Sequence, residues 1–352
     1  MPLLEIKNLK LDFLSGETSA RAVDGVSLAM EAGETVCLDG ESGCGKTVTA
    51  LSIARLVPTP PAKYVGGEIL LNGRDVLKMS PADLLGIRGG VVSYVFQEPS
   101  ASLNPVIRIG KQIKESLRLH RPEKATDDEV IGLLKLVRIP APESRIRNYP
   151  FEMSGGMQQR VMIAMALASE PKLLVADEPT TALDVTIQAQ ILELLLDLKK
   201  RLGMSILLIT HNLGIVGDIA DRVAVMYAGQ IVELAPAKDL LRRPLHPYTK
   251  ALMNSVPKLS GEEARLTAIP GNVPRIGDFP PGCRFYPRCP SAKQECATTM
   301  PELVEVEPKR WVRCAYANET PPGIREKLAE AARESFSPGD RSNISKIRST
   351  LE

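Results

Sequence analysis

Apolar and polar residues alternate along this chain with the two periods expected of strands and helices. Short apolar runs, which predict buried strands, alternate with longer segments whose apolar residues recur at the spacing of a helix face. Such alternation is typical of a largely parallel sheet with helices on both faces. Strands are expected at 3–9, 34–38, 68–71, 91–96, 172–176, 204–209 and 223–226, and helices at 46–57 and 185–202.

A mainly helical stretch interrupts this alternation between Gln97 and about Ala168. Its amphipathic segments lie near 106–120 and 127–137. We therefore expect a helical subdomain at about 98–168, inserted into the α/β domain.

The character of the sequence changes after residue 240. Prolines and isolated polar turns replace the periodic segments in 241–325, and four of the six cysteines lie there. The last stretch, 326–352, is polar and is expected to be a disordered tail. The sequence therefore predicts three regions, 1–240, 241–325 and 326–352.

Composition narrows the class of function. The net charge of +2 gives no basic field of the kind that nucleic-acid binding usually needs, so no nucleic acid is expected as a partner. No run of eighteen apolar residues occurs, and the first residues lack the layout of a signal peptide. We therefore expect a cytosolic chain that reaches a membrane only through a partner protein.

A glycine-rich loop at 40–47 follows a predicted strand and precedes a predicted helix, which is the context of a phosphate-binding P-loop. Its backbone N–H groups can converge on phosphate oxygens because glycines carry no Cβ. Lys46 is expected to reach the β- and γ-phosphates, and Thr47 to bind Mg²⁺. Cys44, inside the loop, predicts sensitivity to thiol reagents. The residues expected at the phosphates are Gly40, Ser42, Gly43, Gly45, Lys46 and Thr47.

Two carboxylates follow the predicted strand 172–176. Asp177, at the strand end, suits the second position at Mg²⁺, and Glu178 suits a general base for the attacking water. A solvated acidic turn is the alternative, but the P-loop in the same chain favours an ATP hydrolysis site.

Ser154, Gly155 and Gly156 precede another amphipathic segment, 161–168. A Ser at a helix start followed by two glycines leaves several N–H groups unobstructed, which predicts a second anion site. One chain can use both sites if two subunits share each nucleotide. An ordinary helix cap with flexible glycines is the alternative.

These motifs occur in the order typical of the ATP-binding cassette (ABC) ATPases, which this chain resembles. The resemblance implies ATP hydrolysis with Mg²⁺ and makes 1–240 a nucleotide-binding domain. It implies an α/β P-loop NTPase core with an antiparallel β subdomain, an inserted α-helical subdomain and a small cysteine-containing C-terminal extension. The matching residues are Gly40–Thr47, Gln97, Ser154–Gln158, Leu173–Glu178, Ala182–Asp184 and His211.

The resemblance also implies roles for single residues in the ATP site. Phe13 would stack on the adenine. Gln97 would bind Mg²⁺ together with Thr47 and Asp177, and would sense the attacking water. His211 would steady the γ-phosphate during hydrolysis.

Three further roles would act across a subunit interface. Ser154 and Gly156 would contact the γ-phosphate of ATP held by the opposite subunit, and Asp184 would lie in the loop between the subunits. The glycine loop of one chain would thus form only half of an ATP site.

Four segments resemble, more narrowly, the importer ATPases for oligopeptides, dipeptides and nickel: 153–164, 177–189, 243–249 and 281–290. This implies a second, paralogous ATPase subunit, two transmembrane permeases and an extracytoplasmic substrate-binding protein. The chain would lie peripherally on the cytoplasmic face of the inner membrane and energise the import of peptides. Nickel or another small solute as cargo, or a soluble ABC ATPase outside transport, are the alternatives.

Four cysteines of the C-terminal region suggest a metal site. Four thiolates suit either tetrahedral Zn²⁺ or an iron–sulfur cluster. The gaps between them are longer than those typical of structural zinc, and the resemblance implies a [4Fe–4S] cluster, which we expect here. Zn²⁺ and unmetallated thiols are the alternatives. The residues are Cys283, Cys289, Cys296 and Cys314.

Overall fold

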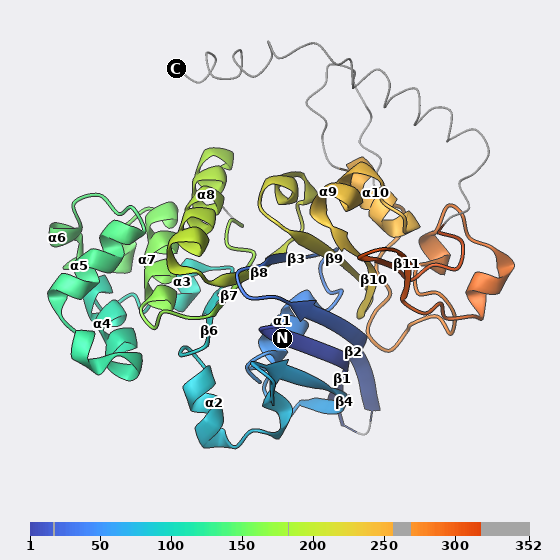
Figure 1. Ribbon diagram of the computed structural model, residues 1–352, viewed down its shortest axis with the longest axis horizontal. Coiled ribbons are helices and arrows are strands. Elements are labelled where there is room, and N and C mark those ends of the chain that lie inside the picture. The colour runs from blue at the N-terminus through green and yellow to red at the C-terminus, as the bar shows by residue number, and fades with distance from the viewer. Residues whose placement is uncertain (17, 182, 256–268, 318–352) are drawn as a thin grey trace, which may run out of the picture. The chain divides into compact units, whose positions relative to one another are not determined.

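Two β-sheets with a helix packed between them form the centre of this structure, a computed structural model (Figure 1). Residues Met1–Cys314 form one compact unit. The expected tail at 326–352 lies outside the described residues. The structure describes residues 1–16, 18–181, 183–255 and 269–317.

The larger sheet has eight strands, and it contains most of the strands predicted from the sequence. Five neighbouring strands are parallel, so their carboxyl ends meet at one edge, where α/β proteins bind ligands. Three antiparallel strands extend the sheet beyond β9. In order across the sheet the strands are β11 (Val304–Glu307), β12 (Arg310–Val312), β10 (Gln230–Pro236), β9 (Arg222–Tyr227), β3 (Thr35–Asp39), β8 (Ser205–Thr210), β7 (Leu173–Asp177) and β6 (Val92–Val95).

The smaller sheet is antiparallel and packs over α1 (Lys46–Ser52). Ile6 and Leu9 of this sheet share one apolar core with Leu38 of the larger sheet and with Ile53, just after the helix. A helix was predicted at 46–57, but α1 ends at Ser52. The left-handed backbone conformation of Arg55 is incompatible with a helix that continues to residue 57. In order the strands are β2 (Thr18–Met30), β1 (Leu4–Ser15), β4 (Ala62–Leu71) and β5 (Arg74–Asp75); α2 (Pro81–Ile87) follows.

The central parallel strands are buried on both faces, so successive side chains enter two different cores. Leu173 and Val175 face the core that contains α1, whereas Leu174 and Ala176 face a second core formed with helices. Most of these helices lie between β6 and β7 in the sequence, where the helical stretch was predicted. They are α3 (Pro99–Ser102), α4 (Ile109–His120), α5 (Asp127–Leu136), α6 (Pro142–Arg145), α7 (Gly155–Leu167) and, after β7, α8 (Val185–Leu202).

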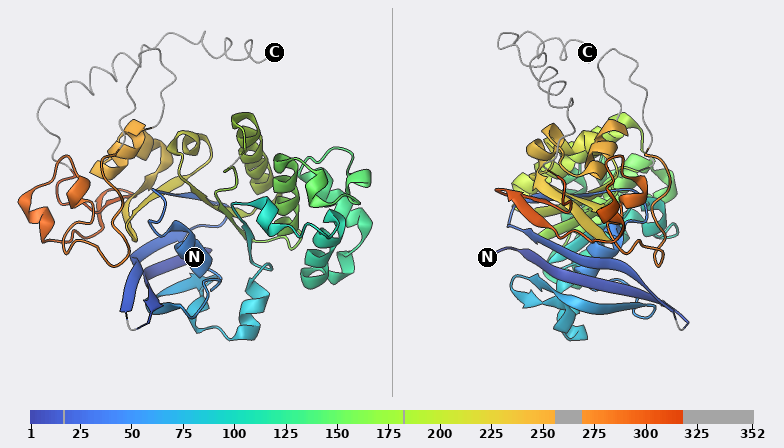
Figure 2. Two further views of the ribbon diagram at one scale, coloured as in Figure 1. Left: turned by 180° about the vertical axis from the view of Figure 1, so that it is seen from behind. Right: turned by 90° about the vertical axis from the view of Figure 1, so that its right-hand side faces the viewer.

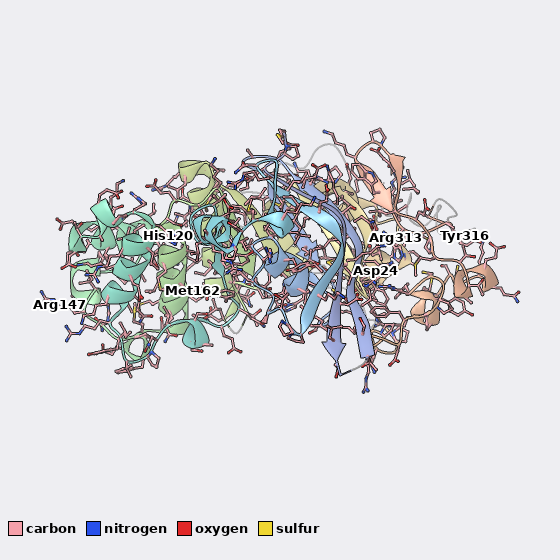
Figure 3. All side chains as sticks on the ribbon, turned by 90° about the horizontal axis from the view of Figure 1, so that it is seen from below. Asp24, His120, Arg147, Met162, Arg313 and Tyr316 are labelled. Carbon is pink, nitrogen blue, oxygen red and sulfur yellow. The ribbon has the colours of Figure 1, made fainter. Side chains whose placement is uncertain are left out.

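The region after residue 240 packs on the opposite end of the larger sheet from α4 and α5 (Figure 2). Its helix α10 (Pro247–Ser255) follows α9 (Ala237–Arg242), and Tyr248 and Phe285 form a third core with Tyr227 of β9. Asp24 of β2 forms an ion pair with Arg284 of this region. Its charge also acts on Arg313, and both residues are labelled in Figure 3. Within the described residues, no helix is both long and apolar enough to cross a membrane.

Candidate functional site

The glycine loop connects β3 to α1 at the carboxyl edge of the larger sheet. Gly40 has a φ of 148°, and a Cβ there would lie 2.2 Å from the carbonyl oxygen of Met226, so only glycine fits. The ammonium group of Lys46 is buried and donates hydrogen bonds to the carbonyls of Gly40 (2.6 Å) and Glu41 (3.1 Å). Ser42 and Gly43 are exposed at the tip of the loop. The loop thus presents a lysine and an open backbone to a phosphate chain.

Thr47 and Asp177 meet beside the loop. The Thr47 hydroxyl acts on the Asp177 carboxylate and lowers its pKa. Burial is the largest influence and raises the pKa of Asp177, and Glu178 adds to this, while Thr47 and the charge of Lys46 oppose it. A hydroxyl and a carboxylate are hard oxygen donors, so this pair fits the chemistry of Mg²⁺.

Three side chains converge on one oxygen of Glu178, Oε2. The amide of Gln97 donates to it at 3.2 Å, the hydroxyl of Thr181 donates at 2.8 Å, and Nδ1 of His211 lies at 3.2 Å. Glu178 itself has a left-handed φ of 47°, which is uncommon for a residue with a side chain. The structure therefore brings together three residues predicted from the sequence, at the ends of β6, β7 and β8.

Two residues at this edge were missed from the sequence. Thr181 lies in the segment 177–189, but no role was predicted for it; its hydroxyl donates a hydrogen bond to Glu178. Asp39 ends β3, its side chain is 1% exposed, and its Oδ2 has no hydrogen-bond partner within the part of the chain that the structure describes. Burial raises the pKa of Asp39 to about 7, with Lys46 lowering it and Glu178 raising it further. A carboxylate ending an apolar strand was the available signal.

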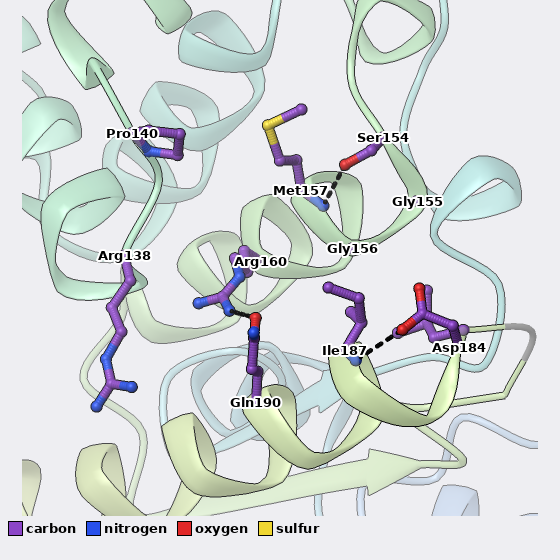
Figure 4. A pocket seen from close by; sticks show the side chains of 11 residues that line it. Arg138, Pro140, Ser154, Gly155, Gly156, Met157, Arg160, Asp184, Ile187 and Gln190 are labelled. Atoms are coloured by element: carbon purple, nitrogen blue, oxygen red, sulfur yellow. Dashed lines mark hydrogen bonds between the residues drawn. The ribbon is translucent and has the colours of Figure 1, made fainter. Parts of the chain in front are cut away.

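The second predicted anion site lies in a separate pocket of about 500 Å³, whose lining includes no residue of the glycine loop (Figure 4). Ser154 caps α7 by accepting the N–H of Met157 at 3.4 Å, and Asp184 caps α8 by accepting the N–H of Ile187 at 3.0 Å. A Cβ on Gly156 would lie 2.8 Å from the Ile187 side chain, so close packing of α7 on α8 also requires this glycine. Gly155 lines the same pocket, and Ala182 is outside the described residues.

Phe13 lies in β1 of the smaller sheet. Its partly buried ring packs against the core between the two sheets. It is therefore on a different sheet from the strand ends that carry Gln97, Asp177 and His211, and its predicted contact with adenine stays a prediction.

Cys44 is fully buried within the glycine loop, and burial raises the pKa of its thiol. Because a thiolate is the reactive form, this argues against the expected sensitivity to thiol reagents. N-Ethylmaleimide is expected to leave Cys44 unlabelled in the native chain and to label it in urea, as measured by peptide mass mapping. Native labelling of Cys44 at the rate of the half-buried Cys296 would contradict this result.

The predicted [4Fe–4S] cluster is wrong, and the alternative of a zinc site fails for the same reason. Across residues 1–16, 18–181, 183–255 and 269–317, no group of three or more His, Cys, Asp or Glu side chains could hold a metal ion. Cys283 and Cys289 pack against the apolar core around Tyr227. Burial raises the pKa of both thiols, that of Cys289 to about 11, so both are protonated near neutral pH in this structure. Cys296 and Cys314 do not complete a ligand set with them.

Comparison with known proteins agrees with this site. The profile of the ABC transporter family matches residues 23–181, and that of the oligopeptide/dipeptide transporter C-terminal region matches residues 232–296. The oligopeptide transport ATP-binding protein AppD of Bacillus subtilis is 51% identical over 314 residues, which cover 89% of this chain and 96% of AppD. The dipeptide transport ATP-binding protein DppD of the same organism is 47% identical over 301 residues, covering 85% and 90% of the two chains.

Solved structures show the same fold. A dimeric structure of the ATP-binding cassette MJ0796 in a post-hydrolysis state, bound to ADP and Pi, superposes with a TM-score of 0.59 at 26% identity. The match covers 66% of this chain and 98% of that one. With its phosphate loop, its paired carboxylates and these relatives, the chain is an ATPase that works with ATP and Mg²⁺, and it belongs to the ATP-binding proteins of the oligopeptide and dipeptide ABC transporters.

Proposed function

We propose that this chain hydrolyses ATP at Glu178 and thereby energises an importer of di- and oligopeptides. The observation that carries the proposal is the convergence of Gln97, Thr181 and His211 on one carboxylate oxygen of Glu178, beside the phosphate loop. The names of the relatives, which refer to oligopeptide and dipeptide transport, support peptides as the cargo. Nickel or another small solute is the alternative cargo.

Within the ATP site, the glycine loop and Lys46 would bind the phosphates. Thr47 and Asp177 would hold Mg²⁺, with Gln97 as a third ligand, and the metal would neutralise phosphate charge. Glu178 would accept a proton from the attacking water, and the hydrogen bonds that Gln97 and Thr181 donate to its Oε2 would orient the carboxylate for this role. His211 would then contact the γ-phosphate, and Phe13 would stack on the adenine.

A second ATPase subunit, which we expect to be a paralogous chain, would complete each site. Ser154, Gly155, Gly156 and Asp184 line a pocket without the glycine loop, so they can contact a nucleotide held by another chain. Val185, next to Asp184, is 81% exposed, as expected for an apolar residue that would be buried against a partner subunit. The dimeric state of the MJ0796 cassette supports this arrangement.

The helices between β6 and β7 would form a subdomain, about 98–168, that docks on two transmembrane permeases. Phe151 is 71% exposed and its ring stacks on Tyr149 with centroids 5.5 Å apart, which fixes an apolar surface. Gln97, at the start of this segment, touches Glu178 and can couple hydrolysis to movement of the helices. The chain would thus lie on the cytoplasmic face of the inner membrane, beneath permeases served by an extracytoplasmic binding protein.

The proposed domain organisation has two main regions, and the first of them contains the helical subdomain. Residues 1–240 would be the nucleotide-binding domain, and 241–325 the C-terminal region of the peptide-importer branch. The second region includes 256–268 and 318–325, which are outside the described residues.

Replacing Phe151 by Asp is expected to abolish co-purification of the chain with its permeases from detergent-solubilised membranes, because a charge would be buried at the contact. Leu85→Asp is the matched control, since Leu85 is also exposed, at 69%, but lies on α2. Equal recovery of permeases with Phe151→Asp and the wild-type chain would count against docking through this subdomain.

A further inference from the structure

The C-terminal region contacts the phosphate loop at Glu41. Arg288 donates two hydrogen bonds to the Glu41 carboxylate, at 2.7 and 2.9 Å. The backbone N–H of Glu41 donates to the hydroxyl of Tyr248 in α10 at 2.8 Å, and its carbonyl accepts from Lys46 at 3.1 Å. Glu41 therefore connects two residues of the C-terminal region to the lysine that binds phosphate.

Arg288 is itself fixed by its surroundings. Its Nε donates to the carbonyl of Pro270 at 2.9 Å, and its guanidinium lies 5.7 Å from the centroid of the Tyr227 ring. The ring of Tyr227 packs on those of Tyr248 and Phe285, with centroids 4.6 and 5.2 Å apart. The Arg288 side chain is only 4% exposed, so its two bonds to the carboxylate have a fixed geometry.

A second contact supports the other end of the loop. The N–H of Gly229, in the turn between β9 and β10, donates to the carbonyl of Cys44 at 2.8 Å. Arg284 of the C-terminal region donates to the carbonyl of Ala228 in the same turn and to the carboxylate of Asp24. The phosphate loop is thus held near its start through Glu41 and near its end through this turn.

We propose that Arg288 and Tyr248 are positioning residues that hold the phosphate loop in its nucleotide-binding conformation through Glu41, so that the C-terminal region sets the affinity for ATP. A loop arranged before its ligand arrives loses less conformational freedom on binding, and therefore binds more tightly. The inference rests on ATP binding at this loop and is independent of which solute is transported.

The test is a double-mutant cycle on the full chain. Arg288→Gln and Glu41→Gln are each expected to raise the Kd for a fluorescent ATP analogue with Mg²⁺ about tenfold. The double variant is expected to show about the same tenfold change, because both substitutions remove one pair. Arg288→Lys keeps the charge but loses the bidentate geometry, so its Kd should lie between that of the wild-type chain and that of Arg288→Gln. In the control Arg243→Gln, an exposed pair with Glu307 is lost and the Kd should stay unchanged.

Circular dichroism melting checks that each variant is folded. Should Arg288→Gln not fold, Glu41→Gln decides the matter with Tyr248→Phe, because Glu41 is 29% exposed and the Phe variant removes only the hydroxyl. A Kd within twofold of the wild-type value for folded single variants, or a double variant whose change is the product of the two single changes, would overturn the proposal. A chain with the expected shifts that imports no peptide would refute the proposed function and leave this inference standing.

Discussion

Replacing Glu178 by Gln is expected to lower the turnover number for ATP roughly 10²- to 10⁴-fold, which is the range for loss of a general base. The amide has the shape of the carboxylate, so Gln97, Thr181 and His211 keep a partner at the same place. The affinity for ATP should therefore change little, because Glu178 does not belong to the phosphate loop. Phosphate release under steady-state conditions and titration with a fluorescent ATP analogue measure the two quantities separately.

The matched control is Thr181→Val, which removes one hydrogen bond to Glu178 and leaves the carboxylate in place. Turnover is expected to fall about tenfold in this variant, because the lost hydrogen bond no longer orients the Glu178 carboxylate. Turnover of Glu178→Gln at the level of the wild-type chain would show that another residue takes the proton.

Asp39→Asn is expected to change how stability depends on pH. Asp39 has a pKa of about 7 in the folded chain and 3.8 as its ordinary value, so the native state keeps its proton over a range in which the unfolded chain has lost it. The free energy of unfolding of the wild-type chain therefore falls as the pH rises from about 4 to 7. An asparagine does not titrate, so the Asp39→Asn variant does not show this fall in the free energy of unfolding.

The size of the effect follows from the pKa difference. Between pH 5.5 and 8, Asp39→Asn should gain about 2 kcal/mol of stability relative to the wild-type chain. Urea unfolding of both chains at the two pH values measures this double difference. Asp128→Asn, which changes an exposed aspartate, is the control. Its free energy of unfolding should differ from that of the wild-type chain by the same amount at both pH values. Parallel curves for Asp39→Asn would mean that Asp39 is ionised in the folded chain at both pH values.

Local signals accounted for the parts of the fold that were predicted well. The helix α8 has the expected bounds, because Asp184 caps its start and Gly203, with a φ of 65°, ends it. The loop between β3 and α1, and the carboxylates after β7, were found because strand, loop and chemistry are adjacent in the sequence.

Features that depend on distant residues could not be predicted in this way. The strands β11 and β12 are short; β12 pairs with β10, which is distant in the sequence, and β11 pairs with β12. The pair between Glu41 and Arg288 joins residues 247 positions apart. Glu41 lies in the phosphate loop and Arg288 in the segment 281–290, but neither motif indicates that the two side chains meet. The cysteine spacing gave the number of thiols but not their places in the fold: Cys283 and Cys289 pack against the core around Tyr227, and no metal-binding group forms among the described residues.

We infer that ATP hydrolysis at Glu178 drives peptide import. The measurement that decides this is uptake of a radiolabelled tripeptide by cells whose only copy of this chain is either wild type or Glu178→Gln, with equal amounts of chain recovered in the membrane fraction. We predict uptake with the wild-type chain and only background uptake with the variant. Equal uptake by the two strains would show that import does not depend on Glu178.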